Sequence, residues 1–428
     1  MTHLENFTTE LPNTLPGEQH NWLTQTRAAG VARFNELGIP STKDEDWKYT
    51  NLRALASKPF NATQREEGLS TINSSELDAT RLVFSNGLFQ SSLSDLTSLP
   101  AGAIVCSMAK ALHIHADKVQ AQLAVLQPED GNVFISLNTG LFTDGTFVFV
   151  PKGVKLEKPV EMTFVATGEQ TFNTPRNLII FEEGAEATII ERHLSSDEST
   201  ALTNTATEIK LSANAQCDFY LIQTAGAKAR QIGGTWVHQE AGSRFSARTI
   251  TLGGQLVRNE LKVTLAGENA HTDCIGLFIG KARQHIDNHT TIRHQAPNCT
   301  SREVYKGILD DRARGVFHGR VVVDQDAQQT FAEQENANLL LSRDAEVDTK
   351  PQLEIYADDV KCSHGATVGE LDAKQIFYLQ SRGIDKDSAR TLLTYAFAAD
   401  VLDEIELPSL KNELRQVVAK NMHLEGIS

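Results

Sequence analysis

The sequence has few cysteines, and it lacks the motifs in which cysteines usually build a site. Five occur among its 428 residues, at Cys106, Cys217, Cys274, Cys299 and Cys362. Because their number is odd and they lie far apart, we expect reduced thiols and no disulfide framework. No Cys-x-x-Cys pair is present, which excludes a standard zinc motif or four-cysteine iron–sulfur motif within this chain.

Signatures of nucleotide hydrolysis, serine hydrolysis and membrane insertion are also absent. The sequence contains no GxxxxGK[ST] phosphate-binding loop and no GxSxG nucleophile elbow. No apolar run reaches the roughly 18–20 residues that span a bilayer, and residues 1–16 lack the basic and apolar segments of a signal peptide. We therefore expect a cytoplasmic protein without membrane association and without ATPase activity of its own.

The sequence has fewer positively charged residues than negatively charged ones. The chain has 40 Lys and Arg against 55 Asp and Glu, which gives a formal net charge of −15. This balance argues against a general nucleic-acid-binding protein, because such a protein needs a basic face to neutralise phosphates. Hydrophobic residues make up 40% of the chain, which is enough for a sizeable core in two or three domains.

Residues 1–135 are predicted to form a mostly helical region with a small hairpin. Apolar residues at helical spacing predict one helix over 16–37 and another over 107–127. Between them, two short β-rich runs at 81–90 are separated by Asn-Gly, which is typical of a tight hairpin turn.

Residues 136–370 are predicted to form a β-rich core. Short β-rich runs alternate with turns there, and no convincing amphipathic helix interrupts them. Four turn residues recur at intervals of 30, 28 and 27 positions: Ala185, Ala215, Ser243 and Ala270. Such a loose repeat favours a β-solenoid in which each turn stacks on the next, with a β-sandwich as the alternative.

Residues 371–428 are predicted to be helical. Asp385 is a suitable N-cap for one helix, and Pro408 is suited to the first turn of a second. The expected inward side chains are Ala389, Leu392, Leu393, Ala396, Phe397, Val401 and Ile405 in the first helix and Leu410, Leu414 and Val417 in the second. We expect the pair to cap the end of the solenoid, and docking on a partner is the alternative.

The pair Cys362 and His364 is the strongest candidate for chemistry. On a strand, side chains two residues apart share a face. A thiolate beside an imidazole suits iron or zinc, but two ligands are too few for a closed tetrahedral site. The pair is therefore either half of a metal site or a buried cysteine beside an ordinary histidine. A nucleophile with its base ranks lower, because no third group to orient the base is evident.

Two polar segments have a structural and a functional interpretation. His285, Asp287 and His289 alternate along a predicted strand and would share one face, as metal ligands can. We favour an exposed polar strand face, or histidines that form hydrogen bonds within the solenoid. The stretch 41–52 holds a tryptophan and a tyrosine, and we expect a loop that its aromatic side chains pin to the body.

Four segments resemble the SufB/SufD family of the SUF iron–sulfur cluster assembly system. They are residues 45–52, 134–145, 284–323 and 348–384. The run Cys-Ser-His-Gly-Ala-Thr at 362–367 resembles the SufD subunits more than the paralogous SufB subunits.

The resemblance implies a right-handed parallel β-helix core between N-terminal and C-terminal helical regions. It further implies a non-catalytic scaffold subunit in a complex of one SufB, two SufC ATPases and one SufD. Cys362 and His364 would complete, with a SufB cysteine, a shared site for iron or a nascent iron–sulfur cluster. No cofactor would be bound permanently by this chain alone, and a role in iron acquisition is also implied.

The resemblance also suggests partner-binding surfaces. We expect Glu354, Tyr356 and Asp358 to lie on a strand that faces SufB. We expect a SufC-facing helical surface at Leu392, Leu393 and Phe397. A homodimer is a further expectation for the isolated chain. The alternative function is a cytosolic β-helix hydrolase or lyase that uses Cys362 and His364.

Overall fold

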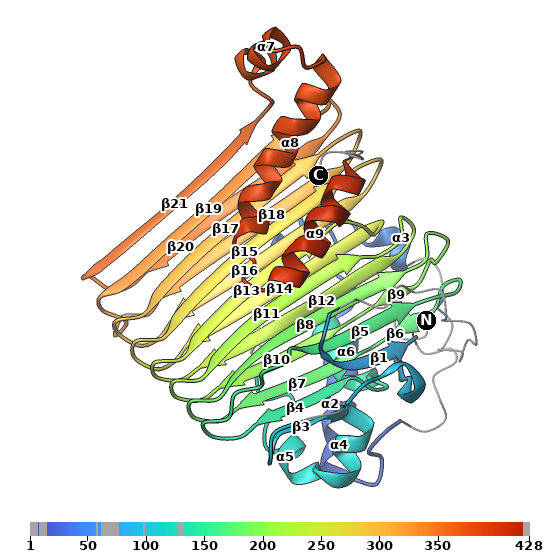
Figure 1. Ribbon diagram of the computed structural model, residues 1–428. Helices are drawn as coiled ribbons and strands as arrows, with labels where there is room; N and C mark the ends of the chain where they lie inside the picture. Colours follow the sequence, from blue (N-terminus) through green and yellow to red (C-terminus); the bar gives the residue numbers. More distant parts are fainter. Residues whose placement is uncertain are drawn as a thin grey trace.

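Two long parallel β-sheets form the body of the protein (Figure 1). This computed structural model describes residues 7, 15–56, 59–60, 77–96, 99–126 and 132–422. The chain winds into a β-solenoid of about eight turns, with helices before and after it. Successive turns add strands in parallel to both sheets. The predicted mainly-β solenoid with flanking helices is confirmed, and a sandwich does not form.

The first sheet, called sheet 1, has ten strands. Their bounds are β1 Thr80–Ser85, β2 Leu88–Phe89, β5 Val160–Ala166, β8 Glu186–Ser195, β11 Gln216–Thr224, β13 Arg244–Thr251, β15 His271–Gly280, β17 Thr300–Leu309, β19 Thr330–Leu340 and β21 Val360–Gly369. The spatial order is β2-β1-β5-β8-β11-β13-β15-β17-β19-β21. Sequence order and spatial order therefore run together from β5 to the end of the solenoid.

The second sheet, called sheet 2, has eleven strands. Their bounds are β3 Ile104–Ser107, β4 Thr146–Val150, β6 Phe172–Asn173, β7 Arg176–Phe181, β9 Leu202–Thr203, β10 Ala206–Leu211, β12 Arg230–Gln239, β14 Leu256–Leu265, β16 His285–His294, β18 Arg314–Val323 and β20 Glu346–Ile355. The spatial order is β20-β18-β16-β14-β12-β10-β7-β4-β3, with β9 beside β12 and β6 beside β9.

Small buried residues occupy the corners that lead into sheet 1. The four turn residues that recur in the sequence are at most 1% exposed. Each follows a residue with φ between 58° and 68°: Gly184, Asn214, Gly242 and Asn269. Glycine and asparagine adopt positive φ at the least cost, so local backbone chemistry explains the repeat. Cys299, after Asn298 with φ 60°, takes the same place in the next turn.

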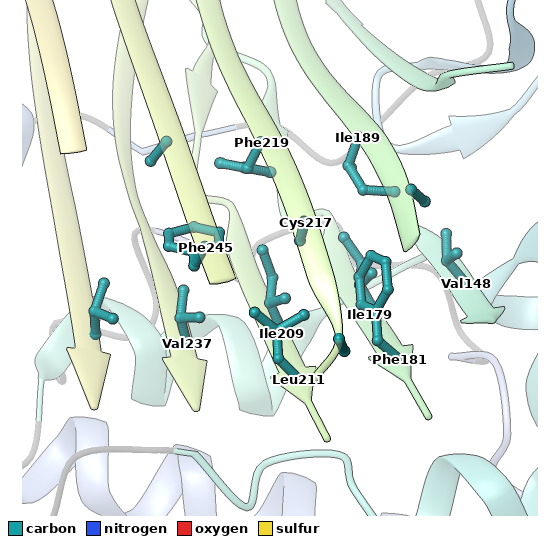
Figure 2. Close-up of a cluster of buried hydrophobic side chains, with 14 of the residues drawn as sticks. Val148, Ile179, Phe181, Ile189, Ile209, Leu211, Cys217, Phe219, Val237 and Phe245 are labelled. Atoms are coloured by element: carbon teal, nitrogen blue, oxygen red, sulfur yellow. The ribbon is translucent and has the colours of Figure 1, made fainter. Parts of the chain in front are cut away.

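Alternate side chains of both sheets fill the interior of the solenoid. Figure 2 shows part of this core, where Phe219 and Phe245 of sheet 1 belong to one buried cluster with Ile209 and Val237 of sheet 2. Burying one such side chain is worth roughly 1.5–3 kcal/mol. The cluster extends over many turns, so the interior holds the stacked strands together.

The N-terminal helices pack beside sheet 2. Their bounds, with two 3-10 turns, are α2 Asn21–Leu37, η1 Glu45–Trp47, α3 Arg53–Ala56, η3 Ser91–Leu93, α4 Met108–Ile114, α5 Ala116–Gln120 and α6 Val133–Leu141. Phe34 and Phe134 of the helices share a buried cluster with Leu202 and Ile232 of sheet 2. None of the helices in the described ranges is long and apolar enough to cross a membrane.

The local predictions for this region hold in part. The helix predicted over 16–37 forms from residue 21 and ends at Gly38, whose φ is 66°. The hairpin is confirmed, with φ values of 47° at Asn86 and 75° at Gly87. The single helix predicted over 107–127 is wrong, because His115 leaves the helical conformation and separates α4 from α5.

Three helices follow the last strand. They are α7 Ala373–Ser381, α8 Lys386–Asp403 and α9 Pro408–Asn421. Asp385 caps α8 by accepting hydrogen bonds from the backbone of Asp387 and Ser388, and Pro408 occupies the first turn of α9. Both predicted helix starts are therefore confirmed.

The buried face of α8 matches the predicted stripe in part, because Ala389, Val401 and the following Ile405 are buried as predicted. The helix buries Thr394, Ala398 and Leu402, while Ala396 is exposed. Leu392, Leu393 and Phe397, the side chains expected to face SufC, are half-buried. In α9, Val418 is buried and Val417 only partly so.

The helices α8 and α9 do not cap the end of the solenoid. Figure 1 shows them lying across the strands of sheet 1. Their buried side chains share a cluster with side chains from the strands beneath: Ile190, Ile222, Ile250, Ile275, Leu277, Ile279 and Ile308. The capping prediction is therefore wrong, because α8 and α9 bury their apolar side chains against the outer side of sheet 1 instead.

Candidate functional site

The last turn of the solenoid is open. β20 and β21 are the outermost strands of their sheets, and no strand in the described part of the chain pairs with their free edges. Eight of the ten residues of β21 are exposed. An uncovered edge strand presents unpaired backbone N–H and C=O groups and is suited to pairing with another chain.

Cys362 and His364 both lie on β21. Cys362 is the register partner of Ala332 on β19 and packs against a small apolar cluster inside the solenoid that includes Val321 and Val323. His364 is the register partner of Gln334 and is exposed. Because residues two apart share a face of a strand, both side chains point toward the interior at its open end, as predicted.

The surroundings of Cys362 favour a protonated thiol. Burial raises the pKa of the thiol, and a backbone hydrogen bond from Ala332 opposes this only in part. A raised pKa is the opposite of what activates a cysteine nucleophile. A metal ion could still displace the proton, since metal binding and thiol deprotonation are coupled. Within the described residues, the pair has no third ligand side chain that would complete a cluster of three.

A column of polar interior residues leads back from His364. Gln334 is the partner of His364 in the register, and Glu303 is the partner of Gln334. The Nε2 atom of Gln334 donates to Oε2 of Glu303 at 2.6 Å. Burial raises the pKa of Glu303 to about 7, against the hydrogen bond from Gln334, which lowers it. Cys274 follows one turn further back, and burial raises the pKa of its thiol.

This column was not predicted from the sequence. Its members are separated by 29 to 31 residues, and each of these separations equals one turn of the solenoid. The spacing would have indicated the column only if the register of the turns had been known.

A cavity of about 720 Å³ opens beside His364. Strands β17, β19 and β21 form one side of it, and α8 contributes Asp400 and Glu404. Arg302 spans the two parts, because its guanidinium lies 3.1 Å from Glu404 and 3.3 Å from Asp273. The cavity therefore lies between the outer side of sheet 1 and α8, and His364 borders it from β21.

The residues expected to face SufB lie near this end. Glu354 is on β20 and pairs with Arg320 at 2.7 Å. Tyr356 and Asp358 lie in the turn between β20 and β21, not on the strand, and both are exposed. The chain leaves the strand there because buried Ala357 forms the next solenoid corner.

The stretch 41–52 packs onto strand β16. The Trp47 ring is buried, and the Arg258 guanidinium stacks 3.9 Å from its centre. The Thr50 hydroxyl lies 2.5 Å from Oδ2 of Asp287 and 2.8 Å from Nε2 of His285. The predicted loop pinned by its tryptophan is confirmed, and two segments far apart in the sequence form one polar cluster.

The strand face of His285, Asp287 and His289 is therefore not exposed, and that part of the prediction is wrong. The N-terminal segment covers it, and Asp287 is only 1% exposed. Burial alone would raise the pKa of Asp287, but Arg258 and His289 hold it well below its usual range. Arg258 Nη1 lies 2.5 Å from Oδ2 of Asp287, so the buried negative charge of Asp287 is neutralised by an ion pair.

Family models match nearly the whole chain. Residues 3–162 match the SufBD protein N-terminal region, and residues 164–397 match the SufBD core domain of SUF system iron–sulfur cluster assembly. The boundary between the two matches falls within strand β5, inside the solenoid.

Relatives from several bacteria match over most of their length. A SufBD family iron–sulfur cluster assembly protein of Synechocystis is 35% identical over 94% of this chain and 92% of that protein. The iron–sulfur cluster assembly protein SufD of Escherichia coli is 33% identical over 88% of each chain. SufD of Bacillus subtilis is 26% identical over 94% of each chain. The chain thus belongs to the SufBD family of the SUF iron–sulfur cluster assembly system.

Proposed function

We propose that this chain is a non-catalytic scaffold subunit in iron–sulfur cluster assembly that pairs with a SufB subunit through the open end of its solenoid. Membership of the SufBD family and the relatives named SufD support the general role. The observation that carries the finer proposal is the uncovered last turn, where β21 presents Cys362 and His364 as an incomplete ligand pair.

Pairing would extend both sheets across the interface. The free edges of β20 and β21 can take up strands from a second solenoid, as in recognition by β-strand addition. A partner cysteine placed against Cys362 and His364 would then bring the ligand set closer to the four that iron or zinc prefers. The iron or nascent cluster is cargo of the complex, and it would be enclosed only when both subunits are present.

The C-terminal helices are the proposed binding surface for the SufC ATPase. The three side chains predicted for this contact, Leu392, Leu393 and Phe397, are half-buried. Phe397 packs against the cluster that α8 and α9 share with sheet 1. α7 lies beyond the end of the sheet (Figure 1) and leaves Phe377 72% exposed and Tyr378 57% exposed. We therefore extend the proposed surface to α7, because exposed aromatic side chains are typical anchors of protein interfaces.

The state of the cysteines supports a reducing, cytoplasmic location. All five are free, and four of them are buried. In oxidising compartments, cysteines of this number more often form disulfides. Cys362, the one partly accessible thiol, is also the one that lies at the proposed interface.

Co-expression tests the proposal. The chain carrying His364→Ala, and separately Cys362→Ser, would be produced with SufB and SufC and purified without oxygen. We expect the complex to form with His364→Ala and its iron and sulfide content to fall. His113→Ala, an exposed histidine on α4, is the matched control and should leave the content unchanged. A full iron and sulfide content in both site variants would refute the shared site.

The alternative of a hydrolase or lyase has less support. Burial raises the pKa of the Cys362 thiol, which opposes its use as a nucleophile. In the described residues, the His364 side chain makes no hydrogen bond that would orient it as a base. Turnover of an ester or polysaccharide by the purified chain, abolished by Cys362→Ser, would reverse this preference.

A further inference from the structure

A second group of metal-ligand side chains lies on the outer face of sheet 2. Asp46, His289 and His318 each offer one ligand atom, and these atoms lie within 4.8 Å of one another. Over the ranges that the structure describes, no other three His, Cys, Asp or Glu side chains are arranged in this way. We propose that these three residues bind a divalent first-row transition metal ion. The site does not depend on the proposed pairing with SufB, because none of its ligands belongs to the open end.

The solenoid itself places the two histidines side by side. His289 on β16 and His318 on β18 are register partners in adjacent parallel strands. Neighbouring strands are about 4.8 Å apart, and the centres of the two rings are also 4.8 Å apart, with the rings inclined at 69°. The pair therefore needs no rearrangement of the backbone to approach a common ion.

The N-terminal segment brings the carboxylate. Asp46 is exposed on η1, and the residues on either side of it are anchored. Trp47 is buried under the guanidinium of Arg258 at 3.9 Å. Glu45 pairs with Lys350 at 2.7 Å. These two contacts hold the turn over the strand pair, so that the carboxylate is presented to the imidazoles.

Each histidine has a hydrogen-bond acceptor behind it. His318 Nε2 lies 2.6 Å from Oε1 of Gln352. His289 Nε2 lies 3.0 Å from Oδ1 of Asp287, a buried oxygen with no other hydrogen-bond partner. Metal-binding histidines commonly donate their second ring N–H to a carboxylate or carbonyl, which fixes the ring and its tautomer. With both Nε2 atoms used in this way, Nδ1 of each ring remains for coordination.

Because of Arg258, the His289 ring has two alternative hydrogen-bonding arrangements. Its Nη1 atom lies 2.9 Å from His289 Nε2 and 2.5 Å from Asp287 Oδ2. A guanidinium can only donate, so Nε2 either accepts from Arg258 or donates to Asp287. Only the second arrangement leaves a lone pair on Nδ1. A metal ion at Nδ1 would favour the arrangement in which Nε2 donates to Asp287. The unpartnered Oδ1 of Asp287 would then accept this hydrogen bond.

The ligand types indicate the class of metal. Two imidazole nitrogens with one carboxylate suit iron(II), cobalt(II) and zinc(II), and such triads leave coordination positions open. The adjoining cavity of about 330 Å³ has room for water or a small ligand at those positions. Its lining contains four carboxylates and two basic side chains, which favours a cation: Glu45, Asp46, Glu260, Glu354, Lys262 and Arg320.

Cobalt(II) is the most informative probe, because its visible absorption reports coordination. The full chain carrying Cys362→Ser and His364→Ala would serve as the background, so that the open end cannot contribute ligands. Metal-free protein would be titrated with cobalt(II), followed by zinc(II) in competition and by iron(II) without oxygen. We expect one equivalent to bind. Asp46→Asn, His289→Gln and His318→Gln should each weaken binding by about tenfold or more.

Asp326→Asn provides the matched control. It removes an exposed carboxylate that does not line the cavity, and it should change affinity less than about threefold, because surface charges act weakly. Gln352→Ala should weaken binding by about tenfold through the loss of the outer hydrogen bond. Absence of a stoichiometric site in the background protein would overturn the proposal. So would equal affinity in Asp46→Asn and Asp326→Asn, and this comparison does not depend on the folding of buried histidine variants.

Discussion

Gln334 Nε2 donates a hydrogen bond of 2.6 Å to Oε2 of Glu303, inside the solenoid and one turn behind His364. The other carboxylate oxygen, Oε1, has no partner in the described residues. A fully buried carboxyl with one strong donor is more stable when protonated. This agrees with the pKa of about 7 that burial imposes on Glu303.

Glu303→Gln should remove a pH dependence of stability. The pKa of Glu303 is raised in the folded chain from an ordinary value of 4.5 to about 7. Its protonation therefore stabilises the fold fully below about pH 4.5, and this contribution is lost as the pH rises to about 7. The loss is on the order of 3 kcal/mol. Glutamine is neutral throughout, so the variant should gain stability relative to the wild type between pH 5 and pH 8, as measured by urea unfolding.

The control for this comparison is Glu333→Gln, since Glu333 is the exposed neighbour of Gln334 on β19. Its unfolding midpoint should follow that of the wild type at every pH. If the free energy of unfolding changed with pH in the same way for Glu303→Gln and the wild type, the assignment of a near-neutral pKa to Glu303 would be contradicted.

Trp47→Ala should destabilise the protein strongly. The ring is 7% exposed, stacks on Arg258 at 3.9 Å and lies 5.4 Å from the Phe134 ring centre. Removing a buried tryptophan typically costs about 3–5 kcal/mol, and the midpoint of urea unfolding should fall accordingly. Lys48→Ala, at the exposed next position, should change stability by less than about 0.5 kcal/mol. Similar midpoints for the two variants would show that stretch 41–52 is not held by its tryptophan.

Features set by local chemistry could be predicted from the sequence. The corner repeat reflects Gly or Asn at positive φ followed by a small buried residue, as at Asn214 and Ala215. The N-cap at Asp385 and the proline start at Pro408 are equally local. The shared face of Cys362 and His364 follows from strand geometry alone.

Features set by long-range packing could not be predicted. The contact of Trp47 with Arg258 joins residues 211 positions apart along the chain, and no periodicity links them. The column from Glu303 to His364 depends on the register between turns. The buried face of α8 depends on its contact with sheet 1, where Ala398 is fully buried and Phe397 packs only partly buried against the same cluster.

The same packing changes how the C-terminal helices must be tested. Removing residues 385–428 would uncover an apolar face of sheet 1 that α8 and α9 now bury. Such a truncation should therefore lower stability as well as partner binding, and it cannot separate the two. Substitutions of exposed residues are the sharper experiment.

Val368→Arg should block pairing at the open end without unfolding the chain. Val368 lies on β21 and is 50% exposed. A surface substitution of this kind typically changes stability by less than about 0.5 kcal/mol. In a closed interface the arginine would be buried without a partner, which is strongly unfavourable. Co-purification with SufB should therefore be lost, while Val125→Arg, at a 60% exposed valine after α5, should leave it intact. Retained pairing would move the interface away from β21.

Phe377→Ala with Tyr378→Ala should abolish binding of the SufC ATPase. The two side chains are 72% and 57% exposed on α7, and Ile376 is the one residue of that helix that is buried. Aromatic side chains at the centre of an interface commonly contribute about 2 kcal/mol or more each, so affinity should fall by well over tenfold. Thermal stability should be nearly unchanged, because little of either ring is buried in the chain itself. Ile114→Ala, at a 56% exposed position on α4, is the control for loss of an exposed apolar side chain. If SufC still binds the double variant and is released by Leu392→Ala with Leu393→Ala, the binding surface lies on α8, as the sequence first indicated.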